Sequence, residues 1–390
     1  MISRMRVAMV ALDFHREGGS ENRTGHLVDA LCRAGHEVHL VGARIRGRWD
    51  AAVRQHTIPA MPRPRWLTLL QFARRATALV QRERFDIVHN QIRPFAPGLV
   101  TIGGGCHRYY LEHVLLHEKG PVAARVKAWA PLHQVLLRLE RQAFRPGGCP
   151  FAIANSRLGR DGLMACYPMP PDRIAIAYNG VDAERFTPGL RERAGHAQRQ
   201  TLGIAPDDLV VLFVGSGFAR KGLGPLISAL SRLVARGLRP VLIVAGGGRT
   251  RVWQRRAARA GLAGRVRFVG HVHKPEAFYA AADVFALPTF FDPFANATLE
   301  AMASGLAVVT SRQNGAAEII APGINGFVIE AAQDVQALAD ALVCLTDSAV
   351  RMALGAAARQ TALQFPWRCS IEGTLAVYGK VLGAELPTTA

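Results

Sequence analysis

The sequence predicts an α/β fold of two doubly wound domains, each with a parallel sheet covered by helices on both faces. Short apolar runs alternate with longer amphipathic stretches, which is the pattern of strands joined by helical crossovers. This alternation begins near the start of the chain and begins again near residue 209. A chain of 390 residues is long enough for two domains that each bury a core. Because ligands of such sheets lie beyond the carboxyl ends of the strands, we expect the site residues there.

The first half opens with a strand, a helix and a second strand. A buried strand is predicted over Val7–Leu12, and helical periodicity follows from Arg23 to Ala34, where Gly35 supplies the stop. The next strand is predicted over Glu37–Val41. The same sheet is predicted to continue through Asp86–His89, Phe151–Ala154 and Ile174–Ala177.

The second half repeats this organisation. Its strands are predicted over Leu209–Val214, Val241–Val244, Val266–Val269, Val284–Leu287 and Ala307–Thr310. A helix over Leu223–Ala235 follows the first of them, and a last helix, begun by Pro366, is predicted to extend to Leu382. Between the halves, the polar and arginine-rich stretch Thr187–Gln200 is predicted to be the linker.

The composition indicates a folded protein of a reducing compartment. Hydrophobic residues make up 49% of the chain and charged residues 20%, which argues against disorder. The six cysteines are scattered without a C-x-x-C pair, so neither a disulfide framework nor structural zinc is expected. The first twelve residues lack the apolar length of a signal peptide, and no stretch reaches the roughly 18 apolar residues that span a bilayer. We therefore expect a cytoplasmic protein.

The formal net charge of +19 has two interpretations that the sequence leaves open. A positive field attracts anionic lipid surfaces, phosphorylated acceptors and nucleic acids. Alternatively, arginine replaces lysine on solvated faces throughout the chain. A nucleic-acid-binding protein is expected to show a stripe of charge with interleaved aromatic residues or a recognised motif, and this chain shows neither. We therefore expect no nucleic-acid partner.

Two adjacent cations follow a buried strand in the second half. After Val214, the residues Gly215, Ser216 and Gly217 allow the backbone to turn sharply and approach a ligand closely. Arg220 and Lys221 then precede the next helix. A guanidinium fork and a compact ammonium together suit a diphosphate. Two solvated cations in a surface loop are the alternative.

Two acids stand eight positions apart further along, at Asp292 and Glu300. Pro293 fits the first turn of a helix and Gly305 its C′ stop, so amides between residues 294 and 298 are predicted to be open to phosphate oxygens. Glu300 is placed to hold a ribose diol, and Asp292 to hold sugar hydroxyls or developing positive charge. Alternatively, Asp292 is an ordinary N-cap and Glu300 a solvated helix acid.

Together these motifs resemble the retaining family 4 glycosyltransferases with the GT-B fold. The landmarks extend from about residue 205 to 330, and include Gly246-Gly247-Gly248, the run Val266 to His271, and the run Asn314 to Glu318. The tract Gly103 to His107 and the overall length most resemble the lipopolysaccharide core glucosyltransferase I branch. Two positions depart from the family pattern, because Asp292 replaces the usual Glu and Ala295 the usual Gly.

The resemblance implies roles for individual residues. Arg220 and Lys221, next to Gly215, would hold the diphosphate, Glu300 the ribose and Asp292 the transferred sugar. Backbone contacts would come from Ala297, Thr298 and Leu299, and the backbone near His271 would meet the base. In the first domain, Gly18 and Gly19 would close over the phosphates, and His107 would lie by the sugar or the acceptor.

The resemblance also implies the chemistry. Transfer would proceed with retention at the anomeric carbon, without a bound metal or other cofactor, because protein cations stabilise the leaving diphosphate. The donor is expected to be UDP-glucose, with UDP-N-acetylglucosamine, UDP-galactose and GDP-mannose as alternatives. In GT-B proteins a terminal helix often returns to the first domain, so the domains are predicted as residues 1–190 with helix 366–390, and 191–365.

The acceptor is expected to be a lipopolysaccharide core or another surface glycan or lipid, bound by the first domain. The segment His113–Arg145 is predicted to be an amphipathic, basic helix that contains Trp129, and such a helix binds anionic bilayers. This predicts peripheral binding to the cytoplasmic face of the inner membrane. The alternatives are a helix packed on its own sheet and, for the whole chain, a basic nucleic-acid- or membrane-binding protein with a degenerate GT-B fold.

Overall fold

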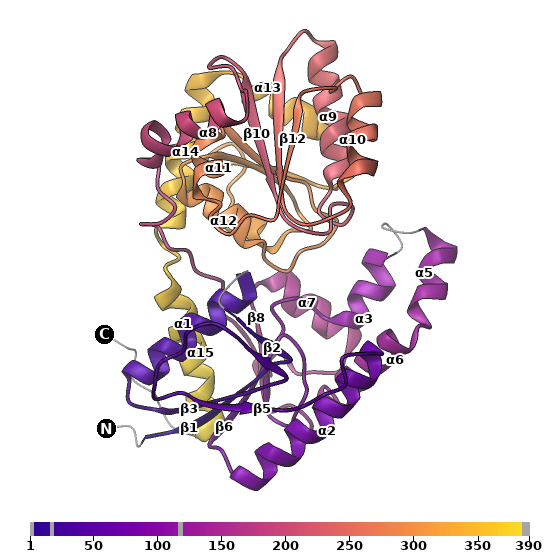
Figure 1. Ribbon diagram of the computed structural model, residues 1–390, viewed down its shortest axis with the longest axis vertical. Helices are drawn as coiled ribbons and strands as arrows, with labels where there is room; N and C mark the ends of the chain where they lie inside the picture. Colours follow the sequence, from indigo (N-terminus) through magenta and orange to yellow (C-terminus); the bar gives the residue numbers. More distant parts are fainter. Residues whose placement is uncertain (1–3, 16–18, 116–119, 384–390) are drawn as a thin grey trace. The chain divides into compact units, whose positions relative to one another are not determined.

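The computed structural model describes residues 4–15, 19–115 and 120–383, which fold as two compact units. Unit 1 contains the chain up to Asn179 together with the helix that begins at Trp367, and unit 2 contains Gly180–Pro366 (Figure 1). The first boundary therefore falls after Asn179 and not after residue 190. The second boundary lies within one residue of the predicted position.

Unit 1 is built on a parallel sheet, with the strand order β5-β3-β1-β6-β7-β8-β9 among the described residues. Val7 of β1 pairs with Val38 of β3 on one side and with Ile87 of β6 on the other. A short parallel pair, β2 with β4, stands outside this sheet. The strands are β1 (Arg6–Val10), β2 (Asp13–Phe14), β3 (Glu37–Gly42), β4 (Arg44–Ile45), β5 (Arg54–Thr57), β6 (Ile87–Gln91), β7 (Leu99–Thr101), β8 (Ala152–Ala154) and β9 (Ile174–Ile176).

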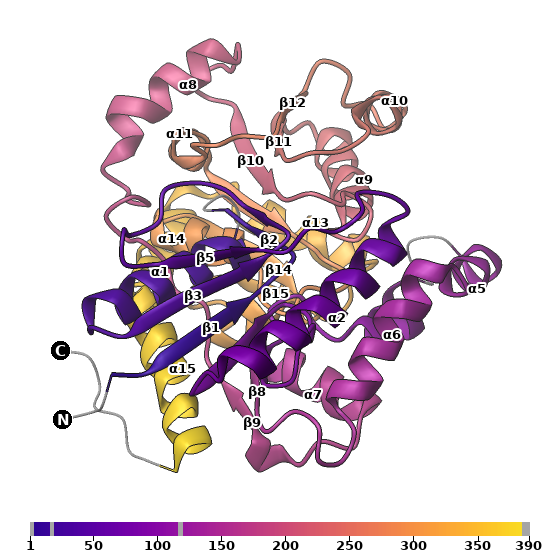
Figure 2. The same ribbon diagram turned by 60° about the horizontal axis from the view of Figure 1, so that its bottom comes forward.

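Helices cover both faces of this sheet, and alternate residues of β1 show it. Val7 and Met9 belong to a core formed with α1 and α15, whereas Ala8 and Val10 belong to a core formed with α2 and α6 (Figure 1, Figure 2). The helices of unit 1 are α1 (Gly19–Arg33), α2 (Arg65–Glu83), α3 (His107–Tyr109), α5 (Pro121–Ala128), α6 (Pro131–Ala143), α7 (Arg157–Cys166) and α15 (Trp367–Leu382).

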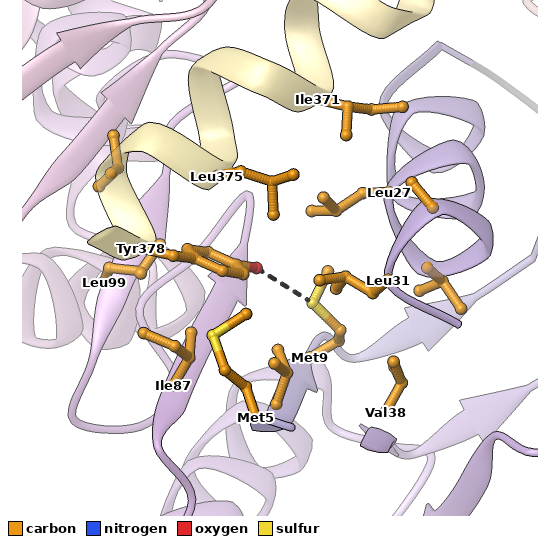
Figure 3. Packing of buried hydrophobic residues seen from close by; sticks show 14 of the residues in the cluster. Met5, Met9, Leu27, Leu31, Val38, Ile87, Leu99, Ile371, Leu375 and Tyr378 are labelled. Carbon is orange, nitrogen blue, oxygen red and sulfur yellow. Dashed lines mark hydrogen bonds between the residues drawn. The ribbon is translucent and has the colours of Figure 1, made fainter. Parts of the chain in front are cut away.

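The last helix, α15, is part of the unit 1 core. Leu375 and Tyr378 pack against Leu27 and Leu31 of α1 (Figure 3). The Tyr378 hydroxyl lies 2.8 Å from His89 Nδ1 and 3.8 Å from Met9 Sδ. Chain segments that are more than 280 residues apart in sequence therefore complete one hydrophobic core.

Unit 2 has a second parallel sheet with the order β12-β11-β10-β13-β14-β15 in the described chain. Its strands are β10 (Leu209–Val214), β11 (Pro240–Ala245), β12 (Val266–Gly270), β13 (Val284–Leu287), β14 (Ala307–Ser311) and β15 (Phe327–Ile329). Its helices are α8 (His196–Thr201), α9 (Leu223–Ala235), α10 (Thr250–Arg259), α11 (Glu276–Ala281), α12 (Asn296–Ala303), α13 (Val335–Cys344) and α14 (Ser348–Ala362). The predicted fold, two Rossmann-like domains with parallel sheets, is confirmed. Since β10, β13 and β14 are neighbours, the loops after them meet at one edge.

The prediction that Thr187–Gln200 is a linker between the domains is wrong. A π-helical turn over Arg191–Gly195 and α8 fold onto unit 2. The guanidinium of Arg199 is buried and donates to Asp283 Oδ2 over 2.7 Å and to the Ala281 carbonyl oxygen over 2.8 Å. Arg191 and Arg199, two of the arginines that suggested a linker, therefore both form ion pairs with Asp283 of unit 2.

The predicted continuous helix over His113–Arg145 is also wrong. A π-helical turn ends at Val114, and α5 and α6 are separate helices with Trp129 and Ala130 between them. Val135, Leu136 and Leu139 of α6 are buried against α2, so the packed alternative holds for α6. On α5, by contrast, Val122 and Val126 are exposed.

In the described parts of the chain, no individual helix has both the length and the apolar character to cross a bilayer, and only the bent pair α13 and α14 passes such a test jointly.

Candidate functional site

The cation loop, residues 215–222, connects β10 to α9 in unit 2. Two backbone hydrogen bonds shape its turns. Lys221 N donates to the Gly217 oxygen over 3.1 Å, and Gly222 N donates to the Ala219 oxygen over 3.1 Å. Gly222 has φ of +81°, and a Cβ atom there would lie 1.7 Å from the Pro288 carbonyl oxygen. Only glycine fits this position, and it brings the loop against the residues that follow β13.

Arg220 and Lys221 point to Asp292, which lies beyond β13. Lys221 Nζ donates to Asp292 Oδ2, and Arg220 Nη1 donates to the same oxygen over 3.3 Å and to the Phe291 carbonyl oxygen over 2.6 Å. Lys221 and Asp292 are each only 8% exposed. The backbone fixes this arrangement as well, because Phe290 N donates to the Arg220 oxygen over 2.8 Å.

The three charges of this cluster set each other's ionisation. Burial opposes the charge on Asp292, but Lys221 and Arg220 outweigh it and hold the pKa of the carboxyl below its usual value. Burial lowers the pKa of Lys221, and Asp292 opposes that change. Two cations thus face one carboxylate, and the cluster keeps an excess positive charge that suits a further anion.

The helix that follows Asp292 begins later than predicted. Pro293 is not in its first turn, because α12 starts at Asn296 with Ala295 as the N-cap. The Asn314 side chain decides this start: its Oδ1 accepts from Ala295 N (3.1 Å), and its Nδ2 donates to Thr298 Oγ1 (3.0 Å) and Thr310 Oγ1 (2.9 Å). Gly305 does follow the helix end, with φ of +74°.

The residues between Asp292 and α12 are consequently held as a loop. Asp292 N donates to the Gln313 oxygen (2.9 Å), and Gly315 N donates to the Asp292 oxygen (2.8 Å). Asp292 Oδ1 accepts from Phe294 N over 3.2 Å. Ala297, Thr298 and Leu299 lie at the beginning of α12, and Thr298 N donates to the Ala295 oxygen over 2.9 Å. Of the amides predicted to be open to phosphate oxygens, those of Phe294, Ala295 and Thr298 therefore have acceptors within the protein. The positive end of α12 thus begins four residues after Asp292.

Glu300 lies on α12 and is half-buried. The hydroxyl of Tyr279 donates to Glu300 Oε2 over 2.7 Å. Burial raises the pKa of Glu300, while the hydrogen bond from Tyr279 and the charge of Arg185 oppose that rise. Tyr279 was not predicted as a site residue, because it lies in the apolar run that precedes β13, where an aromatic residue is expected in the core.

The glycine-rich turn after β11 contacts the cation loop. Gly247 N donates to Ser216 Oγ over 3.2 Å, and Gly246 N donates to the Gly270 oxygen over 2.7 Å. Gly215 N donates to the Ala245 oxygen over 2.9 Å. His271, just beyond Gly270, is exposed, and its ring centroid lies 5.0 Å from that of His273. The ends of β10, β11 and β12 are thereby joined by their backbones.

In unit 1, His107 is a buried residue of α3. Its backbone N–H donates to Glu140 Oε1 over 2.6 Å, and its Nε2 lies 3.0 Å from His133 Nδ1. Burial, together with Arg93 and His133, lowers the pKa of His107 to about 3, so the ring is neutral near neutral pH. Gly18 lies outside the described residues, and Gly19 is the first residue of α1.

The structure brings Arg220, Lys221, Asp292 and the start of α12 together in unit 2. The roles predicted for these residues, for Glu300 and His271, and for His107 and Gly19 in unit 1, stay predictions. Within the described ranges, no three His, Cys, Asp or Glu side chains are grouped so that they could hold a metal ion.

Both halves of the chain match known families. Residues 17–185 match the family described as Glycosyltransferase Family 4, and residues 208–348 match the family described as Glycosyl transferases group 1. D-inositol 3-phosphate glycosyltransferase 2 from Catenulispora acidiphila is 33% identical over 241 residues, which are 58% of this chain and 55% of that protein. The chain thus matches about half the length of this curated relative.

Solved structures share the fold over nearly the whole chain. WaaG, a glycosyltransferase involved in lipopolysaccharide biosynthesis, has a TM-score of 0.80 at 21% identity and covers 95% of this chain and 99% of its own. Anabaena HepE in complex with UDP-glucose has a TM-score of 0.69 at 19% identity and covers 96% of this chain and 100% of its own. The chain therefore carries the two domains of a GT-B glycosyltransferase, a family 4 domain in its first half and a group 1 domain in its second.

Proposed function

We propose that this protein is a hexosyltransferase that moves glucose from UDP-glucose to a hydroxyl of a surface glycan or lipid, with retention at the anomeric carbon. The observation that supports this most is the cluster of buried Lys221 and Asp292 with half-buried Arg220, which carries an excess positive charge beside the N-terminus of α12. A diphosphate has the charge and the acceptor oxygens that such a cluster binds. Glu300, five residues into the same helix, is the carboxylate for the ribose diol.

The chemistry follows from where negative charge develops. As the bond from the anomeric carbon to the diphosphate oxygen breaks, charge accumulates on the leaving diphosphate, and Arg220 and Lys221 stabilise it. The acceptor oxygen bonds to the anomeric carbon on the same face. Its proton passes to the departing phosphate oxygen, so the chain needs no separate general base. Asp292 anchors the two cations, and we propose that it also contacts the transferred sugar.

For the acceptor we propose a lipopolysaccharide core or a related surface glycan. The fold shared with WaaG supports this choice. A phosphorylated polyol is the second candidate, because the curated relatives at 30–34% identity include D-inositol 3-phosphate glycosyltransferases.

Donor and acceptor are tested separately. Thermal shift with UDP-glucose, UDP-galactose, UDP-N-acetylglucosamine and GDP-mannose identifies the donor, because a ligand at about 100 times its dissociation constant adds roughly 2.7 kcal/mol of stability. We expect the largest shift with UDP-glucose. Transfer of radiolabelled glucose to lipopolysaccharide core acceptor or inositol 3-phosphate then identifies the acceptor. If no nucleotide sugar is bound or consumed, the proposed function is wrong.

We further propose that α5 contacts the anionic cytoplasmic surface of the inner membrane. Val122, Val126 and Trp129 are 76%, 71% and 79% exposed, and Arg125 and Lys127 stand exposed between them. Large apolar side chains among cations are the composition of interfacial helices. On the opposite side, Ala124 packs on Leu111 and Leu115, which holds the exposed residues outward.

Liposome co-sedimentation tests this contact. The variant Val122→Ser/Val126→Ser/Trp129→Ser is expected to lose most binding to vesicles of phosphatidylglycerol and phosphatidylethanolamine at low salt. Met352→Ser, which removes an equally exposed apolar side chain of α14, serves as the control and is expected to bind normally. Equal binding by the triple variant and the wild type would rule out α5 as the contact.

A further inference from the structure

We propose that Tyr279 is a positioning residue for donor recognition: its hydroxyl fixes Glu300 so that the carboxylate accepts both hydroxyls of the donor's ribose. This inference rests on the proposed function, because it concerns the same nucleotide site. The hydroxyl lies 2.7 Å from Glu300 Oε2 and 3.4 Å from the Ala297 carbonyl oxygen. A phenol donates one hydrogen, and the shorter contact takes it.

The hydrogen bond selects one orientation of Glu300. A carboxylate has about four lone-pair sites, of which Tyr279 uses one at Oε2. Without a hydrogen-bond partner, the half-buried side chain of Glu300 could adopt several rotamers. With Oε2 fixed, the remaining sites of both oxygens keep a constant direction. A vicinal diol needs this constancy, since its two hydroxyls must be met by a bidentate acceptor.

The ring of Tyr279 is fixed by its packing, so it cannot move together with Glu300 to another rotamer. The residue is fully buried, with 0% exposure. Phe186 meets its ring edge-on at a centroid distance of 5.4 Å and an interplanar angle of 88°, and Phe285 stacks on it at 6.2 Å and 26°. The ring is therefore a fixed support, and the hydroxyl is a fixed donor.

The charged groups around Glu300 give the hydroxyl a second effect. Burial raises the pKa of Glu300 and Glu276 raises it further, whereas the Tyr279 hydroxyl and Arg185 lower it. Arg185 is itself engaged by Glu276, to which its Nε donates. Removing only the hydroxyl therefore takes away one of the two effects that lower the pKa of Glu300, and this pKa should rise. A protonated Glu300 has lost acceptor sites and cannot hold both ribose hydroxyls.

Tyr279 also has an ordinary interpretation, as a core aromatic whose hydroxyl happens to find a partner. Tyr279→Phe separates the two, because it keeps the ring and removes only the donor. If the role is positioning, the loss depends on the ligand's ribose hydroxyls. If the role is packing alone, it does not.

The experiment is calorimetric titration of wild-type protein and Tyr279→Phe with UDP and with 2′,3′-dideoxy-UDP between pH 5 and 8. We expect UDP affinity to fall about tenfold in the variant, the usual size for a lost hydrogen bond to a charged group. Affinity for the dideoxy ligand should fall less than about threefold. The acid limb of UDP binding should move to higher pH. In turnover assays KM should rise while kcat stays, since the ribose contact is equal in ground and transition states.

Tyr378→Phe is the matched control, because it removes the hydroxyl of another fully buried tyrosine that lies in the core of unit 1. Its UDP affinity should equal that of the wild type. Equal losses for both ligands in Tyr279→Phe, or no loss and no movement of the acid limb, would overturn the positioning role. Absence of UDP binding by the wild type would instead contradict the proposed function.

Discussion

Asp292 is both an anchor and a competitor for the two cations of the site. It neutralises Lys221, a buried ammonium that would otherwise lack a counter-charge, and it shares Arg220 with a backbone carbonyl. A bound diphosphate supplies negative charge to the same two side chains. The stability of the ligand-free protein and its affinity for the donor are therefore coupled through this carboxylate.

Asp292→Asn tests the coupling. The variant keeps the shape but leaves Lys221 buried without its carboxylate, so we expect the ligand-free protein to lose about 3 kcal/mol of stability. UDP then provides the missing charge, and its stabilising thermal shift should be larger in the variant than in the wild type. Differential scanning fluorimetry with and without UDP measures both quantities. A smaller shift in the variant would show that Asp292 does not compete with the diphosphate.

The pH dependence of donor binding follows from Glu300. Its folded pKa is raised by burial, so the carboxylate becomes protonated at a higher pH than an exposed glutamate. Because the ribose diol needs the ionised carboxylate, the affinity for UDP should be highest at neutral pH. It should decline as the pH falls through the raised pKa of Glu300. Titration calorimetry of UDP from pH 8 to 4.5 measures the decline. Dideoxy-UDP serves as the control and should show a weaker dependence.

At the level of elements, the sequence was sufficient for many of the buried runs, although it missed the short buried strand β7. The strands β10 and β13 and the helix α9 were predicted to the residue, because each is an apolar or amphipathic run bounded by glycine, proline or charged residues. The edge strand β5 was missed, since Arg54–Thr57 contains only polar residues and is mostly exposed. It is a strand because its backbone pairs with β3, and this pairing leaves no apolar pattern in the sequence.

The start of α12 was misplaced for a different reason. Asp292 and Pro293 have the local appearance of a helix N-terminus, but Asn314 binds Ala295 N from nineteen positions away and fixes the start at Asn296. The sequence therefore singled out Arg220, Lys221 and Asp292, which the structure brings together, but it did not predict the contacts that set their geometry. The pairing of Asp292 with Lys221 and the support of Glu300 by Tyr279 are such long-range contacts, and sequence spacing carries no signal for them.

The turn before α9 gives a test at the same scale. Gly222→Ala places a methyl group against the Pro288 carbonyl at a positive φ, so we expect a loss of about 3 kcal/mol or more. Gly217→Ala is the control: it has a similar φ of +75° but no atom nearer than Arg220 Nε at 4.0 Å, and should cost about 1 kcal/mol. Urea unfolding measures both. Equal costs would mean that the close approach to Pro288 is not required.

At the level of the whole molecule, the C-terminal helix belongs to the unit built from the beginning of the chain. Besides its apolar contacts, Ser370 and Thr374 of α15 accept from the buried guanidinium of Arg23 over 3.2 and 3.1 Å. Burial lowers the pKa of Arg23 to about 10. Without α15 this cation would lose both partners, and Leu27 and Leu31 would lose their cover.

Truncation after Pro366 is therefore expected to unfold unit 1 and to leave unit 2 folded. Limited proteolysis followed by mass spectrometry should recover a resistant fragment that spans about residues 180–366, whereas the full chain should also protect residues 19–115. A truncated chain in which the first 179 residues stay resistant would show that α15 is dispensable for unit 1.

The central claim is that unit 2 binds a nucleoside diphosphate through Arg220, Lys221 and Glu300. Its most direct measurement is titration of UDP into the wild type, Lys221→Ala and Glu300→Ala, with Arg236→Ala, an exposed cation at the far end of α9, as the control. We expect affinity to fall at least about tenfold in the first two variants and to stay unchanged in the control, with wild-type circular dichroism throughout. Wild-type affinity in both Lys221→Ala and Glu300→Ala would contradict the claim.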